Sequence, residues 1–69
     1  MAATVKQLVN RRKIHSIGRS AVAAHMGCTV PWLRFLEAGG VEGATLAKWR
    51  DRYEAALEEL LTEKGRQGD

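Results

Sequence analysis

The sequence contains only one cysteine and one proline, and it has no long apolar run. Because Cys28 is alone, no disulfide can form within the chain, which excludes the cross-links of small secreted domains. No segment approaches the roughly 20 apolar residues that span a membrane, and the first residues lack the apolar core of a signal peptide. These absences predict a cytoplasmic protein that makes no membrane contact.

The sequence also offers little for catalysis or metal binding. His25 and Cys28 are three residues apart, but they straddle a predicted helix end and no second cysteine could complete a zinc site. No serine, histidine and acid are spaced as a catalytic set, and no glycine-rich loop is of the kind that holds phosphates. We therefore expect a protein that is not an enzyme and that uses neither a metal ion nor a cofactor.

What is present fits one small folded domain. The 69 residues are 45% hydrophobic and 28% charged, which is ordinary for a globular protein and too apolar for a disordered one. A chain of this size buries only about 60% of its unfolded surface, which leaves no material for a second domain. We expect residues 1–69 to form a single domain, with no separate module for a small-molecule effector.

Charge is distributed unevenly along the chain. The first 36 residues contain six bases and no acid, and the part from Glu37 onward holds five bases against eight acids. The first part therefore carries +6 and the second −3, which sum to the +3 of the whole chain. An acid-free basic segment suits a polyanion such as nucleic acid, whereas the acidic segment would point away from the same phosphates. The alternative is a chance asymmetry of solvated charges.

Two helices are indicated in the first part of the chain. Thr4 and Gln7 match a capping box, in which each side chain accepts from the backbone N–H of the other, and they predict a helix over 4–13. An alanine-rich pattern predicts a second helix over 19–26, which ends at Gly27.

Two more helices follow. Thr29 is suited to cap a third helix, 29–38, in whose first turn Pro31 is tolerated because that backbone nitrogen has no helical partner. From 44 to 64 no glycine or proline interrupts a fourth helix about 30 Å long. The sequence thus predicts an all-α fold of four helices, or five if the last run divides.

The fourth helix carries an apolar stripe at heptad spacing. Its members are Leu46, Trp49, Tyr53, Ala56 and Leu60, with Leu57 and Leu61 widening the stripe. A helix of that length is as long as a small domain is wide, so we expect its distal part to extend past the core. We therefore expect Leu57, Leu60 and Leu61 to form a homodimer contact, with packing onto the other helices as the alternative.

The two short helices meet at Gly27-Cys28-Thr29, and this junction is the most informative part of the chain. A helix-turn-helix motif requires a small residue where the helices approach, a glycine in the turn, a cap for the second helix and apolar residues beneath it. These requirements are met in order by Ala23, Gly27, Thr29, Leu33 and Leu36. The stretch 19–39 therefore predicts this motif.

The same stretch resembles the helix-turn-helix regulators of the lambda-repressor and Cro type, including the Glu37-Ala38-Gly39 ending. A preceding helix and a following Leu46-x-x-Trp49 also match that family, whereas Gly18-Arg19 stands where the family commonly has Ser or Thr followed by Gln. The resemblance implies a sequence-specific double-stranded-DNA-binding protein, a small transcriptional repressor of phage or plasmid type that acts as a homodimer. Two recognition helices would enter successive major grooves about 34 Å apart.

Two other interpretations remain open. Residues 27–41 also resemble the opening helix-turn-helix of MerR-type regulators, excisionases and small terminase subunits. Those proteins usually begin at the motif and continue into a β wing, whereas here a helix precedes the motif and no strand-like alternation follows it. We rank this resemblance second. The other alternative is a helix-turn-helix scaffold that binds a protein instead of nucleic acid.

The rotation of the third helix follows from Leu33 and Leu36, which mark its core side. Trp32 then flanks the core, and the expected DNA-facing residues are Thr29, Val30, Pro31, Arg34 and Phe35. Arg34 is the one long donor of that face, suited to a guanine edge or a phosphate. An outward Phe35 needs a thymine methyl group or another protein chain to cover it. Phosphate contacts are expected from Lys6, Arg11, Arg12, Lys13 and Arg19.

Overall fold

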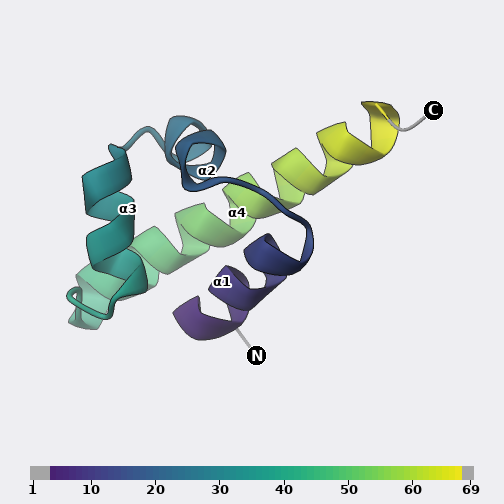
Figure 1. Ribbon diagram of the computed structural model, residues 1–69. Coiled ribbons are helices and arrows are strands. Elements are labelled where there is room, and N and C mark those ends of the chain that lie inside the picture. Colours follow the sequence, from purple (N-terminus) through teal and green to yellow (C-terminus); the bar gives the residue numbers. More distant parts are fainter. Residues whose placement is uncertain (1–3, 68–69) are drawn as a thin grey trace.

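The computed structural model describes residues 4–67, with side chains described through Lys64. It contains the helices α1 (Val5–Ile14), α2 (Arg19–Met26), α3 (Val30–Glu37) and α4 (Gly43–Gln67), and no strand among the described residues (Figure 1). The predicted all-α fold of four helices with a long last helix is confirmed. Each predicted boundary lies within three residues of the observed one, and α4 is a single helix.

The helix starts are set by local side chains. At α1, the backbone N–H of Gln7 donates to the Thr4 hydroxyl at 3.2 Å, and that of Thr4 donates to the Gln7 side-chain oxygen at 2.9 Å. At α3, the backbone N–H of Trp32 donates to the hydroxyl of Thr29 at 3.2 Å, and Pro31 lies in the first turn. These contacts satisfy donors that have no partner within the helix.

The turn between α2 and α3 depends on a glycine. Gly27 has φ +73°, in the left-handed region that favours glycine, and the backbone N–H of Cys28 donates to the Ala23 carbonyl at 3.0 Å. The chain therefore changes direction within three residues, and α3 runs at an angle to α2 (Figure 1).

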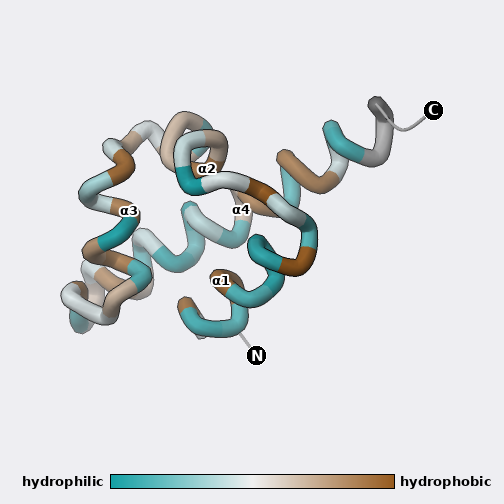
Figure 2. The backbone as a smooth tube through the Cα atoms, in the orientation of Figure 1, coloured by the Kyte–Doolittle hydropathy of each residue, from teal (hydrophilic) through white to brown (hydrophobic). Residues whose placement is uncertain are grey.

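The core lies where α4 meets the three shorter helices. Figure 1 shows α4 running diagonally behind α1, α2 and α3, and Figure 2 shows apolar segments alternating with polar ones along the helices. The buried apolar side chains are Leu8 of α1, Val22, Ala23 and Met26 of α2, Leu33 and Leu36 of α3, Val41 of the connection, and Tyr53, Ala56 and Leu57 of α4. All four helices thus contribute to one core. In the part of the chain that the structure describes, no helix is both long enough and apolar enough to cross a membrane.

Two expectations about α4 need correction. Leu57 is 0% exposed and belongs to the core, so it cannot form a dimer contact at the surface, whereas Leu60 and Leu61 are half-buried at the edge of the core. The buried core includes Leu57 because α1 and α2 both pack on α4. The acids of α4 also do not point away from the basic segment. Glu58 lies 4.0 Å from the guanidinium of Arg11 in α1, and Glu63 lies 3.6 Å from the ring of His25 in α2.

Candidate nucleic-acid interface

The outward face of α3 is the candidate site. Leu33 and Leu36 are fully buried and fix the rotation of the helix. The exposed residues of α3 and its C-cap are Pro31, Arg34, Phe35 and Ala38, and Thr29 is exposed at the N-cap. Of the expected face, Val30 is half-buried against the core edge, so it contributes less surface than its neighbours. Trp32 is half-buried and flanks the core.

Phe35 lies on the C-terminal end of its own helix. The backbone N–H of Gly40 donates to the carbonyl of Phe35 at 3.0 Å, and that of Gly39 donates to the carbonyl of Leu36 at 3.2 Å. This pair of bonds is a Schellman motif, which folds the chain back so that the second residue past the cap meets the side chain near the helix end. A Cβ at Gly40 would lie 2.4 Å from the Phe35 ring. Only glycine leaves room for the ring at this place.

A chain of aromatic contacts connects Phe35 to α4. The Phe35 and Trp32 ring centres are 5.6 Å apart with an angle of 39° between the planes, and the Trp32 and Trp49 centres are 5.5 Å apart in an edge-on arrangement. The guanidinium of Arg52 lies 4.9 Å from the centre of the Trp49 ring. Phe35 is nevertheless 51% exposed. It is therefore fixed on one side and open on the other.

Beneath the site, Glu37 accepts hydrogen bonds from three other helices. Arg12 Nε donates to Glu37 Oε2 at 3.1 Å, Arg19 Nε donates to Oε1 at 2.8 Å, and the Tyr53 hydroxyl donates to Oε2 at 2.6 Å. Arg12 also donates to the Tyr53 hydroxyl at 3.0 Å and to the Ile17 carbonyl at 2.9 Å. The side chains of Arg12 and Glu37 are 7% and 6% exposed.

The expected phosphate contact of Arg12 is therefore wrong. Its guanidinium is buried between helices and its donors are directed at protein acceptors, because a buried charge is stable only when it is paired. Arg12, one of the six bases of the acid-free first segment, thus pairs with Glu37, the first acid of the second segment. The count of free positive charges at the surface is smaller than the sequence indicates.

The network also shifts the ionisation of two groups. Burial by itself raises the pKa of Glu37, but the hydrogen bonds from Tyr53 and Arg19 and the charges of Arg12 and Arg19 outweigh it, so the pKa lies below its ordinary value. Burial, and then the hydrogen bond to Glu37, raise the pKa of the Tyr53 phenol. Glu37 is therefore a carboxylate and Tyr53 a neutral donor at neutral pH.

Arg19 differs from Arg12 because it reaches the surface. Its side chain is 40% exposed, and its bond to Glu37 fixes it beside the last residue of α3. The expected role of Arg19 at a phosphate is thus compatible with its position, and the buried carboxylate orients the side chain.

The bases of α1 divide between two sides of that helix. Arg11 lies 4.0 Å from Glu58, so it faces α4. Lys6 and Lys13 are seven residues apart and therefore share one side of α1, and both are exposed. Lys6 lines a groove of about 480 Å³ together with Ala38 and Gly39 at the C-terminal end of α3. The lysine side of α1 thus borders α3, and the Arg11 side does not.

The motif surface carries no uncompensated negative charge. Residues 19–38 contain a single acid, Glu37, and it is buried between two arginines. Arg34 is exposed and has no ion pair among the described residues. The exposed side of α3 therefore carries the positive charge of Arg34, with Arg19 and Lys6 beside its C-terminal end and the exposed Glu42 in the same groove as Lys6.

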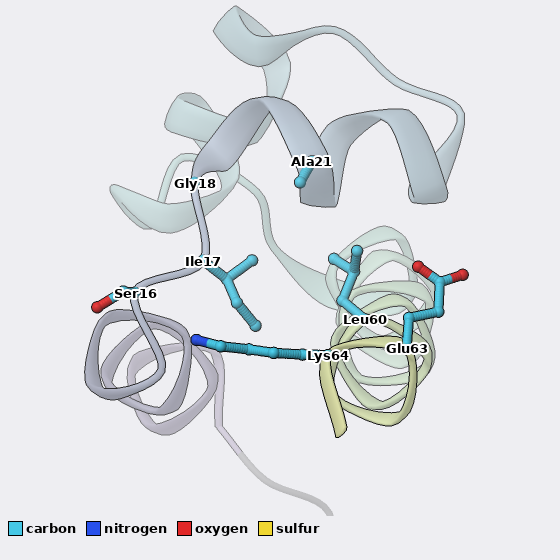
Figure 3. Close-up of a pocket in the computed structure, with 7 residues that line it drawn as sticks. All are labelled: Ser16, Ile17, Gly18, Ala21, Leu60, Glu63 and Lys64. Atoms are coloured by element: carbon cyan, nitrogen blue, oxygen red, sulfur yellow. The ribbon is translucent and has the colours of Figure 1, made fainter. Parts of the chain in front are cut away.

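A second hollow lies on another part of the molecule. It is about 430 Å³ and lies between the α1–α2 connection and the end of α4, with Ile17 and Leu60 on opposite sides of it (Figure 3). The ammonium of Lys64 donates to the His15 carbonyl at 2.6 Å beside it. No group of three metal-binding side chains occurs within the residues that the structure describes. The thiol of Cys28 is half-buried, and this burial raises its pKa.

Sequence reasoning missed several residues that shape the site. The sequence places Tyr53 only in an apolar stripe, Trp49 in that stripe and in the family resemblance, and Glu37 only in that resemblance. A signal for Glu37 was present, because it is the first acid of the chain and directly follows an apolar helix face. Comparisons of the chain with protein-family models, with curated proteins and with solved structures found no match.

Proposed function

We propose that the protein binds double-stranded DNA by placing α3 in the major groove, as a small transcriptional repressor of the lambda-repressor and Cro type. The observation that carries the proposal is the exposed, electropositive side of α3, on which Arg34 is solvated and Glu37 is neutralised from below. A helix fits the roughly 12 Å width of the major groove, and Arg34 has the shape to contact a guanine edge. Arg19, Lys6 and Lys13 would contact the phosphates beside it.

The position of α4 supports a two-fold arrangement. Leu60 and Leu61 are half-buried near the end of α4, and Ile14 of α1 is 77% exposed. Ile14 is three residues after Arg11 and therefore shares its side of α1, and Arg11 lies 4.0 Å from Glu58 of α4. We propose that these residues, without Leu57, form the homodimer contact.

The dimer gives a spacing that can be measured. Trp49, which holds α3, and Leu61 are twelve residues apart, or about 18 Å along the helix. An antiparallel pair of α4 helices that cross at Leu61 would thus separate the two α3 helices by about 36 Å along the axis, which is close to one turn of DNA. Such a protein would occupy a partly palindromic site and block a promoter.

The direct test is retardation of DNA in a gel. A random duplex at low salt is expected to be retarded, and selection from a random pool is expected to give a site with two related halves. Arg34→Ala is expected to weaken binding to that site by tenfold or more while nonspecific binding changes by less than threefold. Arg11→Ala, which removes one positive charge on the α4 side, serves as the control. If the two variants lose the same specific affinity, α3 is not the reading helix.

One observation favours a second candidate function. Phe35 is half-exposed on a face whose one long hydrogen-bond donor is Arg34, and such a face is also suited to a protein partner. A scaffold of that kind would show no retention on heparin or DNA at low salt. The MerR, excisionase and terminase resemblance implies a β wing after the motif, whereas α4 follows directly here.

A further inference from the structure

The exposed side of α3 is chemically sparse, which limits how it can recognise a base. Among Pro31, Arg34, Phe35 and Ala38, only Arg34 has a side-chain donor. In the major groove, base pairs differ in their hydrogen-bonding groups and in the C5-methyl group of thymine. A side chain without donors or acceptors can distinguish bases there only through that methyl group or through shape.

Phe35 is the apolar residue of this side whose position is fixed. Gly40 lies directly under its ring, Trp32 supports it from the side at 5.6 Å, and Trp49 supports Trp32 at 5.5 Å. Phe35 is nevertheless half-exposed. A rigid apolar surface loses little conformational entropy when it is covered, so it is suited to discrimination by a small apolar group.

The surroundings of Phe35 indicate what covers it. The preceding residue, Arg34, is an exposed cation, and the helices α2 and α3 carry no acid other than the buried Glu37. The complementary surface is therefore anionic and also presents an apolar group at the helix. Double-stranded DNA offers both, because the thymine methyl group projects into the groove between the phosphate chains.

We propose that Phe35 recognises the C5-methyl group of a thymine in the bound DNA, and that Gly40 is a positioning residue which keeps the ring in place. This inference rests on the proposed function. If the inference is right, the affinity for the preferred DNA site depends on one thymine methyl group in each half-site. The dependence can be tested without altering any hydrogen bond of the DNA.

The experiment replaces thymine with uracil. The site selected from a random pool is resynthesised with deoxyuridine at each thymine in turn, and the dissociation constant of the full-length protein is measured. Uracil at one thymine per half-site is expected to weaken binding about fourfold per half-site, the value of burying one methyl group. Uracil at the other positions is expected to change binding by less than twofold.

Four variants assign the effect to the Phe35 ring. Phe35→Ala is expected to bind the thymine and uracil sites equally, whereas Arg34→Ala is expected to bind both more weakly and keep their ratio. Gly40→Ala displaces the Phe35 ring and is expected to reduce the ratio below twofold. The circular dichroism of each variant is compared with that of the wild type, and Phe35→Leu, which keeps an apolar side chain, is expected to retain part of the ratio.

The outcomes separate this inference from the proposed function. If the wild type binds its selected site and no uracil substitution weakens binding, the methyl inference is wrong and DNA binding stands. A ratio that survives in Phe35→Ala assigns the methyl group to another residue and also overturns the inference. If no duplex is ever selected, both proposals fail, and the face around Phe35 is left for a protein partner.

Discussion

Arg12 of α1 and Glu37 of α3 are 25 residues apart in the sequence, and their charged groups lie 3.1 Å apart in a nearly buried contact. Tyr53 of α4 and Arg19 of α2 bond to the same carboxylate, so one acid connects all four helices. Because Glu37 is also the last residue of α3, this contact fixes the end of the helix that we propose enters DNA. Stability and the candidate site are thus linked at one residue.

The first prediction concerns that carboxylate. Glu37→Gln removes the negative charge from between two arginines and leaves Arg12 buried without a counter-charge. We expect a loss of about 3–5 kcal/mol in the free energy of unfolding, measured by urea denaturation. Glu58→Gln removes a carboxylate whose side chain is 62% exposed and is expected to cost less than about 1 kcal/mol. Equal losses in the two variants would show that the buried network does not hold the helices together.

The second prediction is a pH dependence with a defined sign. The pKa of Glu37 is lower in the folded protein than in the unfolded chain, so its stabilisation is complete above the unfolded value of about 4.3. It is lost as the pH falls through the lower folded pKa, where the carboxylate is protonated. The melting temperature is therefore expected to fall steeply below about pH 4. The Glu37→Gln variant, which has no proton to gain there, is expected to show a shallower fall.

Local chemistry explains which parts of the fold could be predicted. Thr4 and Thr29 cap their helices through residues three positions away, and Gly27 ends α2 through its own backbone, so these features can be read from short windows. Buried Leu33 and Leu36 gave the rotation of α3 in the same way. Such signals do not depend on how the helices pack.

The predictions that were wrong are those that depend on how the helices pack against one another. Arg12 is one of three consecutive bases, and composition does not tell which of them faces another helix. Leu57 belongs to the same apolar stripe as Leu60 and Leu61, and only the placement of α1 and α2 determines where along α4 the core ends. The contact between Phe35 and Gly40 requires the folded-back end of α3, so a Gly-Gly pair alone could indicate only a helix end.

The third prediction separates the two sides of α1. Binding to a random duplex should weaken as salt rises, with a slope that reflects the number of phosphate contacts. Lys13→Ala is expected to reduce that slope by about one, whereas Arg11→Ala, which faces Glu58, is expected to change it by less than about half of that. Both variants remove one positive charge, so net charge alone would predict equal changes. Equal slopes would therefore contradict the assignment of the lysine side to the DNA.

The last prediction concerns assembly. Ile14→Asp places a charge on a side chain that is 77% exposed, so it is expected to leave folding intact and to shift the sedimentation coefficient from dimer to monomer. Leu61→Ser is expected to weaken the dimer in the same way, whereas Leu57→Asp is expected to unfold the protein because Leu57 is 0% exposed. The selected DNA gives an independent check, since a contact at Leu61 predicts half-sites about one helical turn apart. If the half-sites have that spacing but the wild type sediments as a monomer without DNA, the dimer forms only on the duplex. If the Ile14→Asp variant still sediments as a dimer, the dimer contact lies elsewhere.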